Sequence, residues 1–153
     1  MKRKHYILVA LCLLLPWIGR AQNKLFDKYA EMDGVTSVYI SKSMFNMLPS
    51  VDVNVNLTNI KGKIDYLQLL STEQKDKIEQ MRKEFSTLAT GKLQEFIRVH
   101  SDGTRINFYA TVNGEKIENF IMLSDVDSVY TVIQLTGSFT LKEIQEIASG
   151  ADK

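Results

Sequence analysis

Reactive and metal-binding side chains are scarce in this sequence of 153 residues. It has one cysteine, Cys12, and two histidines, His5 and His100. A single cysteine cannot close a disulfide within the chain, and thiolate zinc sites need several cysteines. If His5 is removed with an N-terminal signal, histidine-based catalysis or zinc ligation depends on His100 alone.

The first 21 residues are organised as a cleavable signal peptide. A basic start at residues 2–4 precedes an apolar run at residues 6–15, and Gly19 and Ala21 give the small-x-small pattern of a cleavage site. A retained membrane anchor is the alternative, but the apolar run is shorter than the ~20 residues that cross a bilayer. We therefore expect cleavage after Ala21, before Gln22, and a periplasmic or extracellular protein without a transmembrane segment.

The signal also determines what remains in the exported chain. Cys12 lies inside the apolar run and follows Leu11, where a lipid-modified cysteine would need a small residue, so we expect no lipid anchor. Four of the 19 Lys+Arg residues lie before Gln22, and the remaining 15 stand against 18 Asp+Glu residues. A mildly acidic exported domain does not favour a nucleic-acid partner.

Residues 22–153 have no linker, repeat or low-complexity segment, which indicates one domain. Helical periodicity predicts helices near residues 25–30, 41–48, 71–90 and 140–147. The third helix is predicted to begin with a capping box of Ser71 and Gln74, with Thr72 as the alternative cap. The last helix is predicted to begin with a capping box of Thr140 and Glu143. The expected strands are Val35–Ile40, Lys63–Leu70 and a four-stranded antiparallel meander formed by Leu93–His100, Arg105–Val112, Lys116–Leu123 and Ser128–Leu135. Asp102-Gly103 and Asn113-Gly114 predict tight hairpins, and residues 124–127 a looser one.

This order predicts an α+β fold, an antiparallel sheet with the helices packed on one face. The expected core positions are Ile106, Phe108, Ala110, Val112, Ile117, Ile121, Leu123, Val129, Ile133 and Leu135. The other sheet face would then carry the apolar residues Tyr109, Phe120, Met122 and Tyr130, which we interpret as an interaction face. A second core layer beneath the first helix or the 50–62 loop is the alternative.

No catalytic or metal-binding constellation stands out, so we expect a non-enzymatic protein without a cofactor or metal. His100, Ser101 and Asp102 are adjacent on a strand and turn, where their side chains point in different directions and cannot form a triad. Asp125-x-Asp127 lacks the further oxygen ligands of a calcium loop. No phosphate loop or nucleophile elbow is present.

Asp127-Ser128-Val129 resembles the Asp-Ser/Thr-apolar acceptor for O-glycosylation of exported Bacteroidetes proteins. In a chain from that phylum, Ser128 would be the glycan site. The simpler interpretation is that Ser128 begins a strand.

The residues of several segments resemble the DUF4252 family of uncharacterised exported Bacteroidetes proteins. The segments are Leu25-Phe26-Asp27-Lys28-Tyr29-Ala30, Val35-Thr36-Ser37-Val38-Tyr39-Ile40-Ser41-Lys42, Leu48-Pro49 and Ile133-Gln134-Leu135-Thr136-Gly137. The family has no assigned catalytic residues. Its members often neighbour extracytoplasmic-function sigma-factor systems, so the resemblance implies a link to envelope regulation. We therefore expect an interaction or binding protein of the cell envelope, with an envelope protein or a second copy as partner. A small-ligand-binding protein or a hydrolase with an unrecognised site is the alternative.

Overall fold

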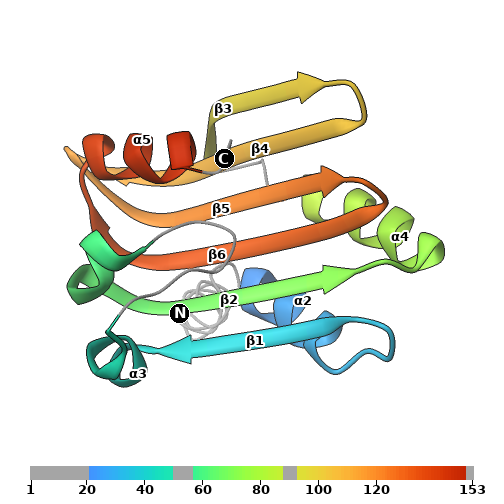
Figure 1. Cartoon of the computed structure of the whole chain (residues 1–153), viewed down its shortest axis with the longest axis horizontal. Coiled ribbons are helices and arrows are strands. Elements are labelled where there is room, and N and C mark those ends of the chain that lie inside the picture. The colour runs from blue at the N-terminus through green and yellow to red at the C-terminus, as the bar shows by residue number, and fades with distance from the viewer. Residues whose placement is uncertain (1–20, 50–56, 88–92, 151–153) are drawn as a thin grey trace, which may run out of the picture.

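The described residues form one antiparallel sheet of six strands in the order β1-β2-β6-β5-β4-β3 (Figure 1). The computed structural model describes residues 21–49, 57–87 and 93–150. The strands are β1 Thr36–Ser41, β2 Ile64–Thr72, β3 Leu93–Ser101, β4 Thr104–Asn113, β5 Lys116–Val126 and β6 Val129–Phe139. The expected meander is confirmed as β3 to β6, and the two earlier strands extend the sheet beyond β6.

The hairpin turns lie where the sequence predicts them, but the two turns with glycine lack the positive φ at both central residues that such sequences favour in tight hairpins. At Asp102-Gly103 and at Asn113-Gly114, only the glycines have positive φ, +74° and +64°. The turn between β5 and β6 is the one with positive φ at both central residues, 50° at Asp127 and 65° at Ser128, as a two-residue type I′ hairpin requires. The expectation of a looser turn there is corrected, and Ser128 precedes its strand instead of starting it.

The helices are short, and side-chain caps mark the start of two of them, α3 and α5. They are α2 Ala21–Ala30, α3 Lys42–Met47, the 3-10 helix η2 Thr58–Lys63, α4 Lys75–Ser86 and α5 Leu141–Gly150. The Ser41 side chain caps α3 through the Met44 N–H at 3.4 Å, and Thr140 and Glu143 form the expected capping box of α5.

The predicted cap of α4 is wrong. Gln74 is the N-cap residue and makes no side-chain capping hydrogen bond. Ser71 still belongs to β2, where its hydroxyl lies 3.2 Å from that of Thr131 on β6. Thr72 Oγ1 donates to the Gly34 carbonyl at 2.8 Å and accepts from the Gln74 N–H at 3.2 Å, so it joins the chain before β1 to the chain after β2.

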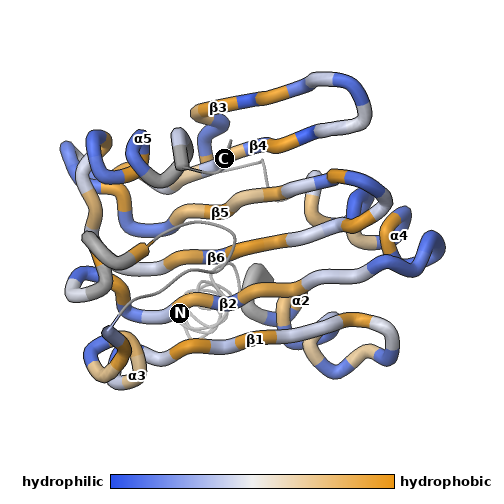
Figure 2. The backbone as a smooth tube through the Cα atoms, viewed as in Figure 1, coloured by the Kyte–Doolittle hydropathy of each residue, from blue (hydrophilic) through white to orange (hydrophobic). Residues whose placement is uncertain are grey.

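Helices cover both faces of the sheet, not one. Phe26 and Tyr29 of α2 and Phe85 of α4 pack in the core of one face, here called the α2/α4 face. Phe45 of α3 and Ile144 of α5 pack in the core of the other, the α3/α5 face. Figure 2 shows hydrophobic positions along the central strands and hydrophilic ones at the hairpin turns. Two cores explain why the inner strands are apolar on both sides.

A bulge in β5 reverses the expected facing of that strand. Ile117 and Asn119 stand opposite the adjacent residues Val112 and Thr111 of β4, so β5 has one extra residue at this point. Ile117 therefore packs in the same core as Phe120. One extra residue moves every later side chain to the opposite face. Ile121 and Leu123 therefore belong to the α2/α4 core and not to the core of Phe108, with which the alternation had grouped them.

Candidate functional site

The four residues expected to form an interaction face are buried and divided between the two cores. Tyr109 and Tyr130 pack in the α2/α4 core, and Phe120 and Met122 in the α3/α5 core. None is more than 9% exposed. The expectation of one shared face is corrected, because the bulge in β5 displaces Phe120 and Met122 and helices cover both sides. All four residues are core residues, which agrees with the alternative expectation of a second core layer on the other side of the sheet.

Ser128 lies at an exposed position in the β5–β6 turn. Its hydroxyl is therefore accessible to a modifying enzyme, and O-glycosylation at this residue stays a prediction. His100, in β3, is exposed as well. In the described part of the chain, no three His, Cys, Asp or Glu side chains gather as ligands of a metal ion.

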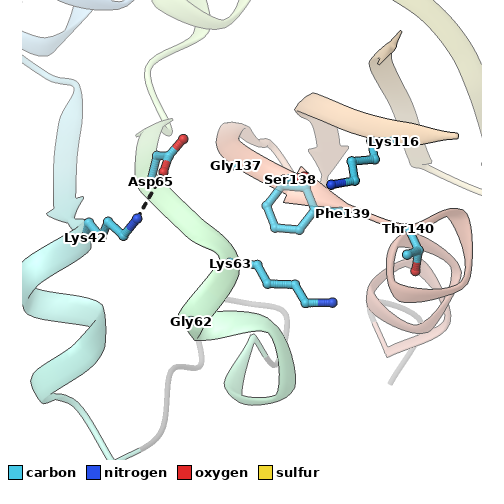
Figure 3. A pocket seen from close by; sticks show the side chains of 9 residues that line it. All are labelled: Lys42, Gly62, Lys63, Asp65, Lys116, Gly137, Ser138, Phe139 and Thr140. Carbon is cyan, nitrogen blue, oxygen red and sulfur yellow. Dashed lines mark ion pairs between the residues drawn. The ribbon is translucent and has the colours of Figure 1, made fainter. Parts of the chain in front are cut away.

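A shallow basic hollow of about 400 Å³ lies at one end of the sheet (Figure 3). We call it the lysine hollow. Its walls are Lys42, Gly62, Lys63, Asp65, Lys116, Gly137, Ser138, Phe139 and Thr140. The three lysines come from the start of α3, the end of η2 and the start of β5. Such a cluster would attract an anion if its charge were free.

Carboxylates neutralise most of that charge. Lys42 Nζ lies 3.7 Å from an oxygen of Asp65, and Lys63 pairs with Glu143. Burial acts to raise the pKa of Glu143, but hydrogen bonds from Lys63 and the Thr140 N–H lower it on balance. The N-terminus of α5 therefore already holds an anion from its own chain. The lysine hollow is built from two ion pairs, one that joins α3 to β2 and one that joins η2 to α5.

A second hollow, of about 470 Å³, lies on the α2/α4 face beside β1. We call it the tyrosine hollow. It is lined by Asp27, Ala30, Ser37, Tyr39, Tyr66 and Gln68. The rings of Tyr39 and Tyr66 stack with centroids 5.7 Å apart and planes inclined by 27°. Tyr39 is 61% exposed, so it offers an aromatic surface to solvent.

A strip of polar side chains continues from the tyrosine hollow toward the middle of the sheet. Gln68 and Tyr66 on β2 are the direct cross-strand partners of Gln134 and Thr136 on β6. Gln134 Nε2 donates to Asn119 Oδ1 on β5 at 3.2 Å. Gln134, Thr136 and Asn119 form what we call the polar strip. Gln134 Oε1 and Thr136 Oγ1 are buried and have no hydrogen-bond partner among the described residues.

The two edges of the sheet differ in character. The edge strand β3 carries Glu95 and Arg98, which form an ion pair at 2.8 Å, and its register with β4 shifts between Glu95 and Ile97. Charges and bulges are the features that prevent an edge strand from pairing with another chain. The sequence of β1, TSVYIS, has no charge and no proline, and its register with β2 is regular. Of the two edges in the described part of the chain, β1 is therefore the one without charges or a bulge.

Sequence reasoning did not identify the tyrosine hollow, the polar strip or the edge. The uncharged run from Thr36 to Ser41 was visible in the sequence, but its edge position follows only from strand order. Gln134 and Thr136 alternate with apolar residues, and only the register shows that Gln68 and Tyr66 stand opposite them.

No helix in the described ranges is long and apolar enough to cross a membrane. No curated protein and no solved structure matches the chain. A family described as a domain of unknown function, DUF4252, matches residues 29–147. That span runs from the last turn of α2 into α5 and includes every strand of the sheet. The α+β chain described above belongs to the DUF4252 family.

Proposed function

We propose that this chain is an exported, non-catalytic interaction protein of the bacterial cell envelope that binds its partner through the edge strand β1. The observation that carries the proposal is the contrast between the two edges of the sheet. An edge strand presents a row of unpaired N–H and C=O groups, which can pair with a strand from another chain. Strand β3 has charges and a bulge against such pairing, whereas β1 has neither.

The side chains of β1 favour an uncharged, extended partner segment. Val38 and Tyr39 are 36% and 61% exposed and point to opposite faces of the sheet. An added strand would cover both, and its own alternate side chains would contact them. Main-chain hydrogen bonds would supply affinity, and pockets for alternate side chains would supply selectivity.

Export and a place in the cell envelope rest on the signal-peptide pattern of residues 1–21. We expect N-terminal sequencing of the exported protein to begin at Gln22. A start at Met1 in the envelope fraction would contradict cleavage. The link to envelope regulation is part of the same proposal and requires the partner to be identified.

The two edges offer a matched test by site-specific photocrosslinking. Tyr39 and Phe96 are exposed aromatic residues on β1 and β3, so p-benzoylphenylalanine is a conservative replacement at either position. We expect a discrete adduct from position 39 in cells that export the full chain, and none from position 96. Adding Val38→Lys should remove the adduct, because a buried charge opposes strand pairing.

The mass of the adduct identifies the partner. An adduct of twice the chain mass indicates a second copy, and any other discrete mass is identified by mass spectrometry. The proposal fails if neither position gives an adduct, if both give the same adducts, or if Val38→Lys leaves the adduct unchanged while circular dichroism shows a folded chain.

Small-ligand binding is the second candidate, and the tyrosine hollow favours it. Its stacked rings and its amide lie together at one place on the α2/α4 face. Aromatic rings beside a few polar groups are a combination that occurs in small-molecule sites.

A further inference from the structure

Exposed apolar side chains gather at the β1 edge of the sheet. Val38 and Tyr39 of β1 are 36% and 61% exposed, and Met44 and Met47 of α3 are 49% and 79% exposed. The other exposed large apolar residues of the described chain lie on three different elements and are Phe96, Val112 and Leu141. Single exposed apolar residues are ordinary on a protein surface, whereas a cluster of them marks an interaction site. The apolar cluster of β1 and α3 therefore belongs to the edge at which we place the partner.

Helix α3 covers one end of β1 and leaves the other end bare. Ile40 and Ser41, next to α3, are partly buried, whereas Thr36 to Tyr39 are exposed. Figure 1 shows α3 at the C-terminal end of β1. Ile40 packs against the α3/α5 core, and side chains alternate along a strand, so Thr36 and Val38 point to the same face. On this face, the N-terminal half of β1 lacks the cover that α3 gives to the C-terminal half.

We infer, on the basis of the proposed use of the β1 edge, that its partner is a second copy of this chain, paired antiparallel about a two-fold axis at Val38. An axis perpendicular to the sheet reverses the strand and leaves each face of the sheet on its own side. The partner's α3 then lies over the bare end of β1. Met44 and Met47 of each copy cover Thr36 and Val38 of the other.

The residues that this pairing brings together are compatible with one another. Val38 stands opposite the partner's Val38, and Tyr39 stands opposite the partner's Ser37, which is small and lines the partner's tyrosine hollow. The ring of Tyr39 therefore has room at the mouth of that hollow. A strand that pairs with its own copy must be uncharged at its centre, because like charges would otherwise stand opposite each other. The sequence TSVYIS meets this condition.

Charges at the ends of the paired strands are complementary. In the same register, Lys42, directly after β1, stands opposite the partner's Gly34 and next to the partner's Asp33. The side chain of Lys42 is 61% exposed, and Asp33 is exposed as well. The two-fold axis forms this contact twice, once at each end of the strand pair. Opposite charges at the rim of an interface help to fix its register.

Introduced cysteines test the partner in cells that export the full chain. Cys12→Ala removes the single cysteine of the sequence, so each introduced cysteine is the only one present. Directly opposed residues of antiparallel strands have Cα atoms about 4.5–5.5 Å apart, within the ~4.4–6.8 Å that a disulfide spans. We expect Val38→Cys to give, on oxidation, a disulfide-linked species of twice the chain mass on a non-reducing gel. Phe96→Cys, on the opposite edge strand β3, should give none.

Two positions away from the axis test the register. Thr36 stands opposite the partner's Ile40, whereas the two copies of Thr36 are about 14 Å apart, four residues along the strand. Thr36→Cys and Ile40→Cys should therefore each stay monomeric alone and form a mixed dimer when one cell exports both variants.

A matched pair of glutamate variants tests the contact of α3. Met44→Glu should lower the yield of the Val38→Cys dimer roughly tenfold, because it places a charge in an apolar contact. Leu141→Glu is the control, since Leu141 on α5 is 47% exposed and lies outside the apolar cluster. It should leave the yield unchanged. An unchanged yield with Met44→Glu would overturn the contact of α3.

Photocrosslinking at position 39 separates a failure of this inference from a failure of the edge proposal. A position-39 adduct of another mass, without a Val38→Cys dimer, overturns the second copy and leaves the edge proposal intact. The absence of both adduct and dimer overturns both. An equal yield of dimer from Phe96→Cys overturns the two-fold pairing. The register at Val38 is overturned if Thr36→Cys or Ile40→Cys links to itself, or if only position 39 gives an adduct of twice the chain mass.

Discussion

Lys28 on α2 donates hydrogen bonds to both carboxylate oxygens of Glu84 on α4, at 2.9 and 3.1 Å. Gln80, one turn before Glu84, donates to the same carboxylate at 3.3 Å. The bond from Lys28 lowers the pKa of Glu84, against the opposing effect of burial, and Gln80 adds to the lowering. The two helices that cover the α2/α4 face are therefore joined by a charged contact at their surface.

This contact predicts a pH dependence of stability that Glu84→Gln removes. The pKa of Glu84 is lower in the folded protein than in the unfolded chain, where it lies near ~4.3. Its stabilising effect is therefore complete above that value and is lost as the pH falls through the folded pKa. We expect Glu84→Gln to cost about 0.5 kcal/mol at pH 7, as for other partly exposed pairs, and nothing at the acid end.

Urea unfolding at a series of pH values between about 3 and 7 measures the difference between the two proteins. Glu79→Gln, at an exposed position of the same helix, is the matched control. A difference between wild type and Glu84→Gln that is constant with pH, or that grows in acid, would contradict the assignment.

The β5–β6 turn holds two non-glycine residues in the left-handed region, and relieving it should stabilise the protein. The φ angles of Asp127 and Ser128 are 50° and 65°. The left-handed conformation costs an ordinary residue ~1–2 kcal/mol, and replacing the residue by glycine removes this strain. Part of the resulting stabilisation is offset because glycine loses more conformational entropy when the chain folds. We expect Ser128→Gly to raise the unfolding free energy by about 0.5 kcal/mol, measured from the urea midpoint.

Gly103→Ser is the reverse experiment in the β3–β4 turn. Gly103 has φ of +74° and open space where a Cβ would lie, so only backbone strain opposes the serine. This variant should lose stability by a similar or larger amount. If both variants shift the midpoint in the same direction, the strain interpretation is wrong.

Gly137 on β6 marks a close approach to the end of η2 that leaves no room for a side chain. A Cβ at this position would lie 2.2 Å from the backbone oxygen of Lys63 and 2.7 Å from the ring of Phe139. Backbone cannot move aside as a flexible side chain can, so we expect Gly137→Ala to cost about 2–3 kcal/mol. Gly62→Ala is the control, since no atom lies within 4 Å of the Cβ it would add. Thermal unfolding of the two variants should differ clearly, and equal midpoints would contradict the close approach.

Features encoded by neighbouring residues could be predicted from the sequence. The caps at Ser41 and Thr140 and the turns at Gly103 and Gly114 depend on local side chains and local backbone freedom. The strand meander follows from these turns and from the apolar segments between them. The family resemblance is confirmed by the match of the family to residues 29–147.

Features that depend on register could not be predicted in the same way. The bulge between Ile117 and Asn119 determines which core Phe120 enters. No glycine or other turn-forming residue marks this bulge in the sequence of β5. The sequence also does not reveal that helices cover both faces of the sheet. Apolar residues on both sides of a strand are compatible with a second core and with an interface. The tyrosine hollow requires Tyr39, Tyr66 and Gln68 to come together, which strand order alone decides.

Phe120 provides the sharpest distinction between a core residue and an interface residue. Its ring stacks on that of Phe108 with centroids 5.4 Å apart, and the side chain is 3% exposed in the α3/α5 core. We expect Phe120→Ala to cost about 3–5 kcal/mol, because it leaves a cavity between the sheet and the helices. Tyr39→Ala, at an exposed position that loses only the stacking on Tyr66, should cost about 1 kcal/mol or less. Urea unfolding of both variants measures the contrast. A stable Phe120→Ala variant that has lost partner crosslinking at position 39 would instead place Phe120 at an interface, and would require the α3/α5 face to open.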